Sequence, residues 1–323
     1  MRWLIFPALC LAWLSAALPC PAQDHPGVPD LRHHLLRSTN VDEEYSILVS
    51  LPEGYAASKR TYPVLYVLDA EKSFGLARDV VDWLSWAREM PRMIVVGISY
   101  GEGTAEWWQK RSRDLTSRQD RSKVWGEWPL AGGADAFRRF LSGELFPLIE
   151  SQYRAGPDRV LVGLSFGGLF GAYDLLSPDR LFGRYLLVSP AYGWDYEAIL
   201  GTESAFSAGS SALPAVVYSA IGTEDEPAVV EPWRRFNAQL EARSYAGLRF
   251  HPEEFRGETH ISVFPVALTH GLKWLFGSSA ESVGRSGSEK GEGGAADGGG
   301  AGSRRAGGAS CGVCDTMGFR LRD

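Results

Sequence analysis

Cysteine is scarce in this chain of 323 residues and is missing from its long central part. Cys10 and Cys20 lie close to the N-terminus, and Cys311 and Cys314 lie close to the C-terminus. No disulfide framework can therefore hold the central part, which must fold around a hydrophobic core. Cys311 and Cys314 form a single C-x-x-C spacing without strand or helix patterns around it, and this predicts neither a zinc site nor a redox site.

The chain also lacks an excess of positive charge. It has 33 Lys and Arg against 39 Asp and Glu, which gives a formal net charge of -6. Without a basic surface, nucleic acid is not expected as a partner, and a small-molecule substrate is expected instead. No metal-ligand cluster, phosphate-binding loop or dinucleotide fingerprint occurs in the sequence, so neither a metal nor a cofactor is predicted.

A long apolar run occurs at the N-terminus, over residues 4–18, after a basic residue and before a small-residue segment. This pattern is typical of a secretory signal peptide, which we place at residues 1–22. Pro7 and Pro19 bracket a stretch shorter than the roughly 20 residues that a membrane span needs. We therefore expect a periplasmic or secreted protein without stable membrane insertion after cleavage, and a retained anchor is the alternative.

The C-terminal segment after Phe276 has almost no large apolar residues before Phe319 and is rich in Gly, Ser, Ala and charge. Such a segment cannot bury enough apolar surface to offset the entropy lost on ordering. The composition therefore predicts a disordered Gly/Ser-rich tail over residues 277–323 and a single folded domain over residues 23–276.

Between these ends, short β-rich runs alternate with longer helical patterns. This alternation predicts an α/β fold with a mainly parallel central sheet and helices on both faces. Several runs are apolar nearly throughout, as expected for strands that helices cover on both sides. The predicted strands are 46–51, 62–68, 93–99, 159–164, 185–188, 216–221 and 248–255, and the clearest helices are 135–153 and 264–276.

Residues 101–133 fit neither the strand period nor the helix period. They hold Trp107, Trp108, Trp125 and Trp128 among many charged residues. A structureless segment of this length inside a compact domain is usually functional or disordered, and the tryptophans argue against disorder. We predict either that the segment borders a cleft or that its rings cover a hydrophobic edge of the sheet.

A G-x-S-x-G motif lies between a predicted strand and a helical pattern, in Gly163-Leu-Ser165-Phe-Gly167. In this context the chain turns from strand to helix within one strained residue, and the glycines remove side chains that would collide there. Ser165 would then stand exposed above the sheet. The motif and its surroundings predict that Ser165 is a nucleophile.

A serine nucleophile needs a base that takes its proton. Only His251, His260 and His270 follow Ser165 in the chain. His251 lies in a predicted strand and His270 in a predicted helix, whereas His260 lies in the loop between them. Because catalytic bases commonly lie on loops at the carboxyl ends of strands, His260 is the predicted general base.

The acid of a triad should follow the strand before this histidine. The strand 216–221 runs directly into Gly222 and the carboxylates Glu224, Asp225 and Glu226. An acid at this place would fix the imidazole tautomer and stabilise the imidazolium. We favour Asp225, three residues after the glycine, and the neighbouring glutamates are the alternatives.

An oxyanion hole requires two backbone N–H groups. One comes from the residue after the nucleophile, here Phe166, and the other from the loop after an earlier strand. That loop follows residues 62–68, so the second amide is expected from Glu71 or Ala70. Asp69 in the same loop is interpreted as a carboxylate that orders the loop, because it precedes the nucleophile in the chain.

Five motifs together resemble the esterase D-like family of α/β-hydrolases. The resemblance extends over residues 35–276 and implies an α/β-hydrolase fold and carboxylic ester hydrolysis, with Ser165 and His260 as nucleophile and base. The motifs are Tyr62-Pro-Val-Leu-Tyr-Val-Leu-Asp69, Gly132-Gly-Ala-Asp-Ala-Phe137, Gly163-Leu-Ser-Phe-Gly167, Ser189-Pro190 and Gly257-Glu-Thr-His260.

A further stretch, Arg111-Ser-Arg113-Asp114-Leu-Thr116, resembles one near the substrate cleft in the siderophore-hydrolase branch of this family. The resemblance implies that Arg113 contacts substrate, and Trp107 and Trp108 are expected beside it. Some members of that branch use a weak third group or none, so a Ser165–His260 dyad is the alternative to a triad.

The function that these patterns predict is serine-dependent hydrolysis of a small-molecule ester, of siderophore type or another acyl ester, through an acyl-enzyme. One alternative is acyl transfer, in which the Trp-bearing segment excludes water and an alcohol takes the acyl group. A second alternative is a non-catalytic exported binding protein. The presence of Ser165, Asp225 and His260 together argues against that alternative, because a binding module has no need of all three.

Overall fold

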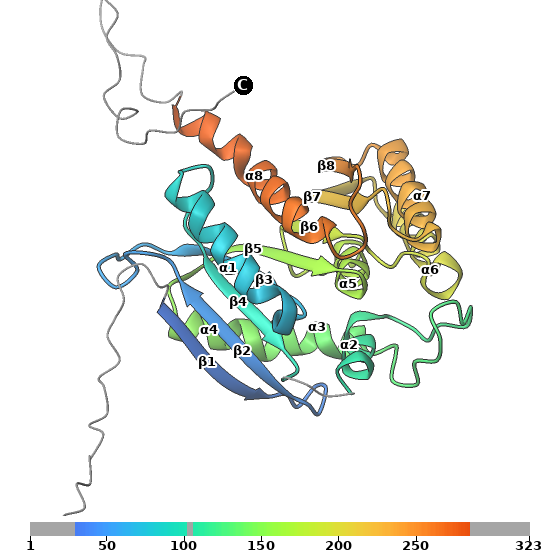
Figure 1. The fold of residues 1–323 in the computed structure, drawn as a ribbon, viewed down its shortest axis with the longest axis horizontal. Helices are drawn as coiled ribbons and strands as arrows, with labels where there is room; N and C mark the ends of the chain where they lie inside the picture. The colour runs from blue at the N-terminus through green and yellow to red at the C-terminus, as the bar shows by residue number, and fades with distance from the viewer. Residues whose placement is uncertain (1–29, 102–105, 285–323) are drawn as a thin grey trace, which may run out of the picture. The chain divides into compact units, whose positions relative to one another are not determined.

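The computed structural model describes residues 30–101 and 106–284. The predicted signal peptide, residues 1–22, lies outside the described residues, and so does the part of the predicted tail after Gly284. Figure 1 shows the described chain as a central sheet with helices packed against it.

The sheet has eight strands in the order β1-β2-β4-β3-β5-β6-β7-β8. Six neighbouring strands, from β4 to β8 in this order, are parallel, whereas β2 pairs antiparallel with both β1 and β4. The predicted mainly parallel sheet is thus confirmed. The strands are β1 (Asp30–Arg37), β2 (Glu44–Leu51), β3 (Tyr62–Val67), β4 (Ile94–Ser99), β5 (Ala155–Leu164), β6 (Arg184–Val188), β7 (Ala212–Gly222) and β8 (Ala246–Phe255).

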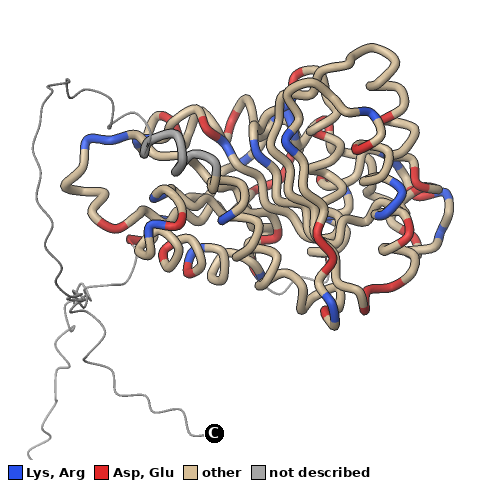
Figure 2. The backbone as a smooth tube through the Cα atoms, turned by 90° about the horizontal axis from the view of Figure 1, so that it is seen from above, with Lys and Arg blue, Asp and Glu red and all other residues tan. Residues whose placement is uncertain are grey.

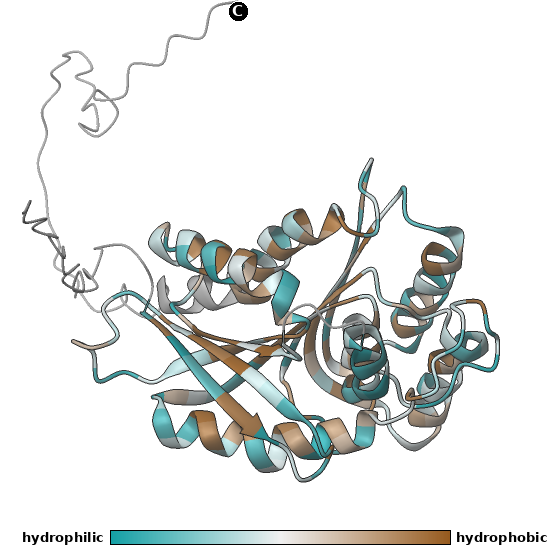
Figure 3. Ribbon diagram, turned by 60° about the horizontal axis from the view of Figure 1, so that its bottom comes forward, coloured by the Kyte–Doolittle hydropathy of each residue, from teal (hydrophilic) through white to brown (hydrophobic). Residues whose placement is uncertain are grey.

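Helices cover both faces of the sheet, as predicted. One hydrophobic core joins α1 and α8 to one face, and a second core joins α3 to α7 to the other face. Figure 3 shows hydrophobic residues along the strands and on the helix sides that face them. The helices are α1 (Ala70–Trp86), α2 (Trp107–Leu115), α3 (Ala134–Phe140), α4 (Phe146–Gln152), α5 (Phe166–Leu175), α6 (Trp194–Gly209), α7 (Pro227–Arg243) and α8 (Val263–Gly284).

Four features differ from those that the sequence predicted. The predicted helix 135–153 is two α-helices, α3 and α4, joined by a π-helical turn at Leu141–Leu145. The segment 101–133 contains a helix, α2, whose apolar pattern is too short to stand out among its charges. The last helix continues to Gly284, so the expected domain boundary at residue 276 falls inside it. β1 was not predicted, because this edge strand is largely exposed and mostly polar.

Charged residues of both signs are spread along the helices and loops, and the central strands carry few of them (Figure 2). This distribution agrees with the small net negative charge of the sequence. No helix among the described residues is long and apolar enough to cross a membrane.

The loops at the carboxyl ends of the parallel strands bring the predicted site residues to one edge of the sheet. Ser165 follows β5, Asp225 lies in the loop after β7, and His260 lies in the loop after β8. Ala70 begins α1 directly after β3. Ligands of open α/β sheets bind at this edge, which directs the search for a site to these loops.

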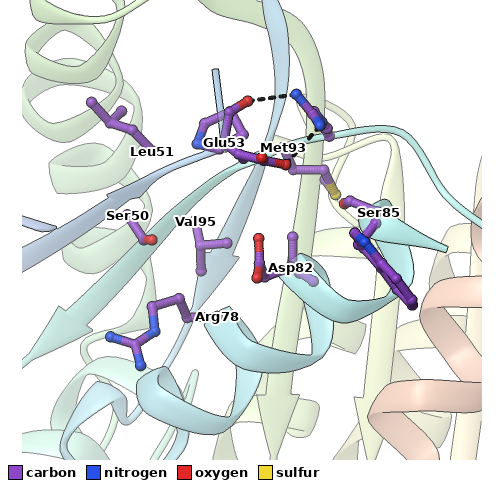
Figure 4. Close-up of a pocket in the computed structure, with 12 residues that line it drawn as sticks. Ser50, Leu51, Glu53, Arg78, Asp82, Ser85, Met93 and Val95 are labelled. Carbon is purple, nitrogen blue, oxygen red and sulfur yellow. Dashed lines mark hydrogen bonds and ion pairs between the residues drawn. The ribbon is translucent and has the colours of Figure 1, made fainter. Parts of the chain in front are cut away.

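The opposite end of the sheet holds a small cavity between β2, β4 and α1 (Figure 4). Arg92 donates a hydrogen bond to Glu53 at its rim, with Nη2 2.8 Å from Oε2. The cavity measures about 20 Å³. That volume has room for about one water molecule and for no larger ligand.

Candidate active site

The turn at Ser165 has the geometry of a nucleophile elbow. Ser165 joins β5 to α5 with φ 60° and ψ -116°, a conformation outside the regions that L-residues favour. Such a residue costs about 1–3 kcal/mol and persists only where its surroundings impose it. The backbone N–H of Ser165 donates to the Val188 carbonyl at 3.0 Å, and the Ala191 N–H donates to the Ser165 carbonyl at 3.1 Å.

The first glycine of the motif is required by close packing at this turn. A Cβ atom on Gly163 would lie 2.3 Å from the carbonyl carbon of Gly167, and one on Gly168, directly after the motif, would lie 2.7 Å from Cβ of Pro190. Neither distance is possible without moving backbone. The steric cause that the sequence predicted thus holds for Gly163, whereas a Cβ atom on Gly167 would lie 3.5 Å from Leu68, an ordinary contact distance.

His260 and Asp225 are hydrogen-bonded to each other. His260 Nδ1 lies 2.9 Å from Oδ2 and 3.1 Å from Oδ1 of Asp225. The Asp225 side chain is fully buried, whereas the imidazole is 29% exposed. Asp225 Oδ1 also accepts the backbone N–H of Glu226 at 2.8 Å. Because an ionised carboxylate only accepts hydrogen bonds, the ring proton is assigned to Nδ1, and Nε2 is left free to accept a proton.

Glu224 and Glu226, the alternative acids, are both exposed. Among the described residues, neither carboxylate has a hydrogen bond or ion pair with His260. The structure thus brings Asp225, and not its neighbours, against the imidazole.

The loops that carry Asp225 and His260 are packed backbone to backbone. The Glu224 N–H donates to the Glu258 carbonyl at 2.9 Å. A Cβ atom on Gly222 would lie 2.1 Å from that same oxygen. Only glycine allows this approach, which holds the two loops at the distance that the Asp225–His260 hydrogen bond requires.

A cavity of about 450 Å³ opens at the elbow and contains both Ser165 and His260 in its lining. One wall is aromatic and cationic, with Trp107, Trp108 and Arg111. The other wall is aliphatic and aromatic and comes from α1 and the start of α8. The full lining is Leu68, Asp69, Lys72, Ser73, Leu76, Trp107, Trp108, Arg111, Leu164, Ser165, His260, Ile261, Phe264 and Pro265.

The predicted oxyanion donors lie at two helix N-termini beside this cavity. Phe166 is the first residue of α5, and Ala70 and Glu71 are the first two residues of α1. First-turn N–H groups have no acceptor within their own helix, and the helix dipole favours negative charge at that end. The Glu71 carboxylate points elsewhere, because it accepts hydrogen bonds from Ser99 Oγ and from the backbone N–H of Tyr100.

The predicted substrate residues divide into two groups. Trp107 and Trp108 line the cavity, as expected for substrate contacts. Arg113 does not line it, so the expectation that Arg113 contacts substrate does not fit the structure. Its guanidinium bonds to Asp114, with Nε 2.7 Å from Oδ1, and forms an ion pair with Glu43 at 3.3 Å.

Arg113 instead belongs to a structural network that fixes α2 against β2. The Asp114 carboxylate is completely buried and also accepts a hydrogen bond from the Tyr45 hydroxyl at 2.5 Å. Burial raises the pKa of Asp114, although the hydrogen bonds from Arg113 and Tyr45 oppose this effect. The network orients the helix so that Arg111, two residues earlier, points into the cavity.

Arg111 and Lys72 are cavity residues that sequence reasoning did not select. Arg111 lies in the stretch that suggested Arg113, and residues two apart on a helix face different directions. The helix phase of such a short segment could not be read from its sequence. Lys72 lies on the first turn of α1, which was not predicted as a helix.

The sheet order, the strained serine turn and the imidazole–carboxylate pair together define an α/β-hydrolase. A family model described as "Putative esterase" matches residues 38–275. The chain therefore belongs to this esterase family, and it is an esterase.

Its relatives include siderophore esterases. The chain is 31% identical to the ferri-bacillibactin esterase BesA of Bacillus subtilis (strain 168), over 76% of this chain and 90% of that protein. It is 28% identical to a siderophore enterobactin esterase of Emericella nidulans, over 74% of this chain and 91% of that protein. The resemblance to the esterase D-like family near its siderophore-hydrolase branch is thus confirmed.

Solved structures agree with this assignment. An IroE-like serine hydrolase from Shewanella oneidensis superposes with a TM-score of 0.70 and 29% sequence identity, covering 77% of this chain and 80% of that one. Among the residues that the structure describes, no cluster of three or more His, Cys, Asp or Glu side chains could hold a metal ion.

Proposed function

We propose that this esterase uses a Ser165–His260–Asp225 triad to hydrolyse ester bonds of a siderophore-type substrate. The observation that carries the proposal is the arrangement around His260. Its Nδ1 lies 2.9 Å from the buried Asp225 carboxylate. The same imidazole borders a cavity that also contains Ser165 at its strained turn.

In the proposed mechanism, Ser165 Oγ attacks the ester carbonyl carbon while His260 Nε2 takes the hydroxyl proton. The protonated imidazole then donates this proton to the leaving alkoxide, and the acyl group remains on Ser165. Asp225 keeps the imidazole in the required tautomer and stabilises its positive charge. Water, activated by the same histidine, releases the acid and restores the serine.

The oxyanion of the tetrahedral intermediate is held by the Phe166 amide and by the amide of Ala70 or Glu71. Both sources are first-turn N–H groups of helices beside the cavity. Each such donor contributes about 10²–10³ in kcat when it is preorganised. Acyl transfer to an alcohol would use the same steps with a different acceptor, and product analysis in the presence of glycerol distinguishes the two reactions.

Two observations support a siderophore-type substrate. The first is the printed function of two relatives, a ferri-bacillibactin esterase and a siderophore enterobactin esterase. The second is the chemistry of the cavity. The rings of Trp107 and Trp108 and the cation Lys72 lie in its lining, whereas the Arg111 guanidinium is already paired with Asp69. This combination suits a substrate with aromatic and negatively charged groups.

The substrate is tested by comparing three ester classes on purified protein: cyclic trilactone siderophores with and without iron, feruloyl esters, and short-chain nitrophenyl esters. We expect kcat/KM for a trilactone to exceed that for the other two classes by at least about tenfold, because only the trilactone siderophore offers aromatic groups to the tryptophans and negative charge to Lys72 together. Preference for feruloyl esters, or no trilactone turnover, contradicts the substrate assignment while leaving the esterase activity in place.

We also propose that the protein is exported to the periplasm or secreted. The support is the N-terminal pattern of a basic residue, an apolar run and a small-residue segment before Gln23. Export is checked by expressing the full chain and sequencing the N-terminus of the mature protein. We expect the mature chain to begin at Gln23, because cleavage follows small residues. A mature chain that keeps residues 1–22 contradicts the proposal.

A further inference from the structure

The turn that follows His260 forms an apolar wall of the catalytic cavity. Ile261, Phe264 and Pro265 line the cavity together with the imidazole. They lie on one turn, because the Phe264 N–H donates to the Ile261 carbonyl at 3.2 Å where α8 begins. Ile261 is 67% exposed, whereas Phe264 is buried. The part of a substrate that lies beside the proposed base therefore contacts uncharged, apolar side chains.

Hydrogen bonds hold this turn without using the Ile261 side chain. The Thr259 N–H donates to Ser262 Oγ at 2.9 Å, and the Val263 N–H donates to the Thr259 carbonyl at 3.2 Å. The Ser262 hydroxyl also donates to the Glu258 carboxylate. Single exposed apolar side chains are common on protein surfaces. Ile261 differs from these because a fixed turn places it in the cavity, next to the base.

The aromatic wall of the cavity is connected to the start of α5. The rings of Trp107 and Trp108 meet edge to face, with their centroids 4.5 Å apart. Trp128 links them to Phe166, because its ring centroid lies 6.3 Å from that of Trp108 and 5.6 Å from that of Phe166. The aromatic wall therefore extends to the residue whose amide is a proposed oxyanion donor, whereas the apolar wall begins at the proposed base.

The chemistry of ester cleavage assigns different parts of the substrate to these two walls. In the tetrahedral intermediate, the carbonyl carbon carries Ser165 Oγ, the oxyanion, the acyl group and the leaving oxygen. When the bond from this carbon to the leaving oxygen breaks, His260 Nε2 donates its proton to that oxygen, so the alcohol must lie within hydrogen-bond reach of the imidazole. The acyl group stays on Ser165 and extends away from the imidazole. The alcohol therefore lies against the apolar turn, and the acyl group lies toward the tryptophans.

We propose that Ile261, Phe264 and Pro265 form an alcohol wall, in which Ile261 determines specificity, and that Trp107 and Trp108 form an acyl wall. The inference rests on the proposed Ser165 mechanism and assigns the two parts of its substrate to separate walls. The two walls favour an ester of an apolar alcohol with an acid that carries an aromatic ring. The reason is that apolar surface leaves water on one wall and ring contacts form on the other.

The test measures kcat/KM of Ile261→Thr and Trp108→Leu on two pairs of esters. Butyl and methoxyethyl phenylpropanoate share the acid and differ in the polarity of the alcohol, whereas nitrophenyl phenylpropanoate and nitrophenyl butyrate share the alcohol. We expect Ile261→Thr to lower the preference for butyl over methoxyethyl by about fivefold and to leave the acyl preference unchanged, because a partly exposed apolar contact discriminates less than a closed pocket. Trp108→Leu should lower the preference for phenylpropanoate over butyrate by about fivefold and leave the alcohol preference unchanged. Intrinsic reactivity cancels, because each ratio is compared with the wild-type ratio.

Deacylation gives a second readout, because the acyl-enzyme no longer contains the alcohol. Its rate is the steady turnover that follows the burst of nitrophenol from nitrophenyl phenylpropanoate. Ile261→Thr should leave this rate unchanged, since water has replaced the alcohol beside His260. A substitution that merely displaced His260 would slow it, because the same imidazole activates the water. Trp108→Leu should lower the rate, because the acyl wall still positions the acyl group on Ser165.

Val124→Thr and Trp83→Leu are the matched controls for the two substitutions. Val124 is 64% exposed and Trp83 is 67% exposed, and neither lines the cavity. Both control variants should keep the wild-type ratios. The two test residues are likewise exposed, so the fold should be unaffected, and active-site titration corrects the rates for inactive molecules.

Three outcomes overturn the inference. If Ile261→Thr changes the acyl preference and not the alcohol preference, the two walls are assigned the wrong way round. If it slows deacylation as much as acylation, Ile261 acts through His260 and does not select the alcohol. If both variants keep the wild-type ratios, neither wall selects its part of the ester. The proposed function is judged separately, by wild-type turnover of nitrophenyl butyrate and by the loss of that turnover in Ser165→Ala.

Discussion

Ser165→Ala is expected to abolish ester turnover while leaving the fold intact. The substitution removes one oxygen at the cavity surface, where the strained turn is held by backbone hydrogen bonds that alanine retains. Removing the nucleophile of a serine hydrolase costs up to about 10⁶-fold in kcat. Turnover of a nitrophenyl ester, with the melting temperature measured alongside, checks the expectation.

His260→Ala should have an effect of similar size, and the double variant should be no worse than either single variant, because the two groups act as one unit. His270→Ala is the matched control. His270 lies on α8 with its Nδ1 3.3 Å from Glu253, and it does not line the catalytic cavity. More than about a tenth of wild-type activity in Ser165→Ala or His260→Ala would refute the assignment.

Asp225→Asn is expected to lower turnover by about 10⁴-fold, the loss known for this change in strict triads. Asparagine keeps the shape of the buried side chain, but it can present an N–H to His260 Nδ1 and hold the wrong tautomer. It also cannot stabilise the imidazolium that forms when Ser165 loses its proton. The Asp225 side chain is fully buried, so water does not screen the loss of its charge.

Glu224→Gln and Glu226→Gln are the controls for this prediction, because both side chains are exposed and neither has a hydrogen bond or ion pair with His260 among the described residues. Exposed carboxylates contribute little, and both variants should stay near the wild-type rate. All three variants are compared on one activated ester. If none loses more than about tenfold, the site works as a Ser165–His260 dyad and the triad assignment is wrong.

The alternation of strands and helices was readable because burial on both faces of a parallel sheet leaves continuous apolar runs. β3 to β7 were predicted for this reason, and β2 and β8 were predicted as well, although β8 contains Arg249, Glu253 and Glu254. β1 was not, because an edge strand that is mostly exposed has no such run. The exposed Leu31 and Leu35 in it give no signal against the polar residues between them.

The residues of the candidate site likewise fall into those that the sequence selected and those that it could not select. The sequence by itself determined Ser165, because a strained turn demands glycines at fixed spacing, and it selected His260 by chain order. It placed three carboxylates in one loop. It favoured Asp225 by its position in the loop and could not show which carboxylate contacts the imidazole. It also pointed to the stretch that holds Arg111 and Arg113, but it favoured Arg113.

Only the tertiary structure decided between these neighbours. Asp225 faces the imidazole because the loops after β7 and β8 pack backbone to backbone at Gly222. Arg111 faces the cavity because the buried Asp114 draws Arg113 to the other side of α2. A sequence motif reflects constraints between residues that are close in the chain. The direction of a side chain depends on partners that are distant in sequence, and the folded structure is needed to identify those partners.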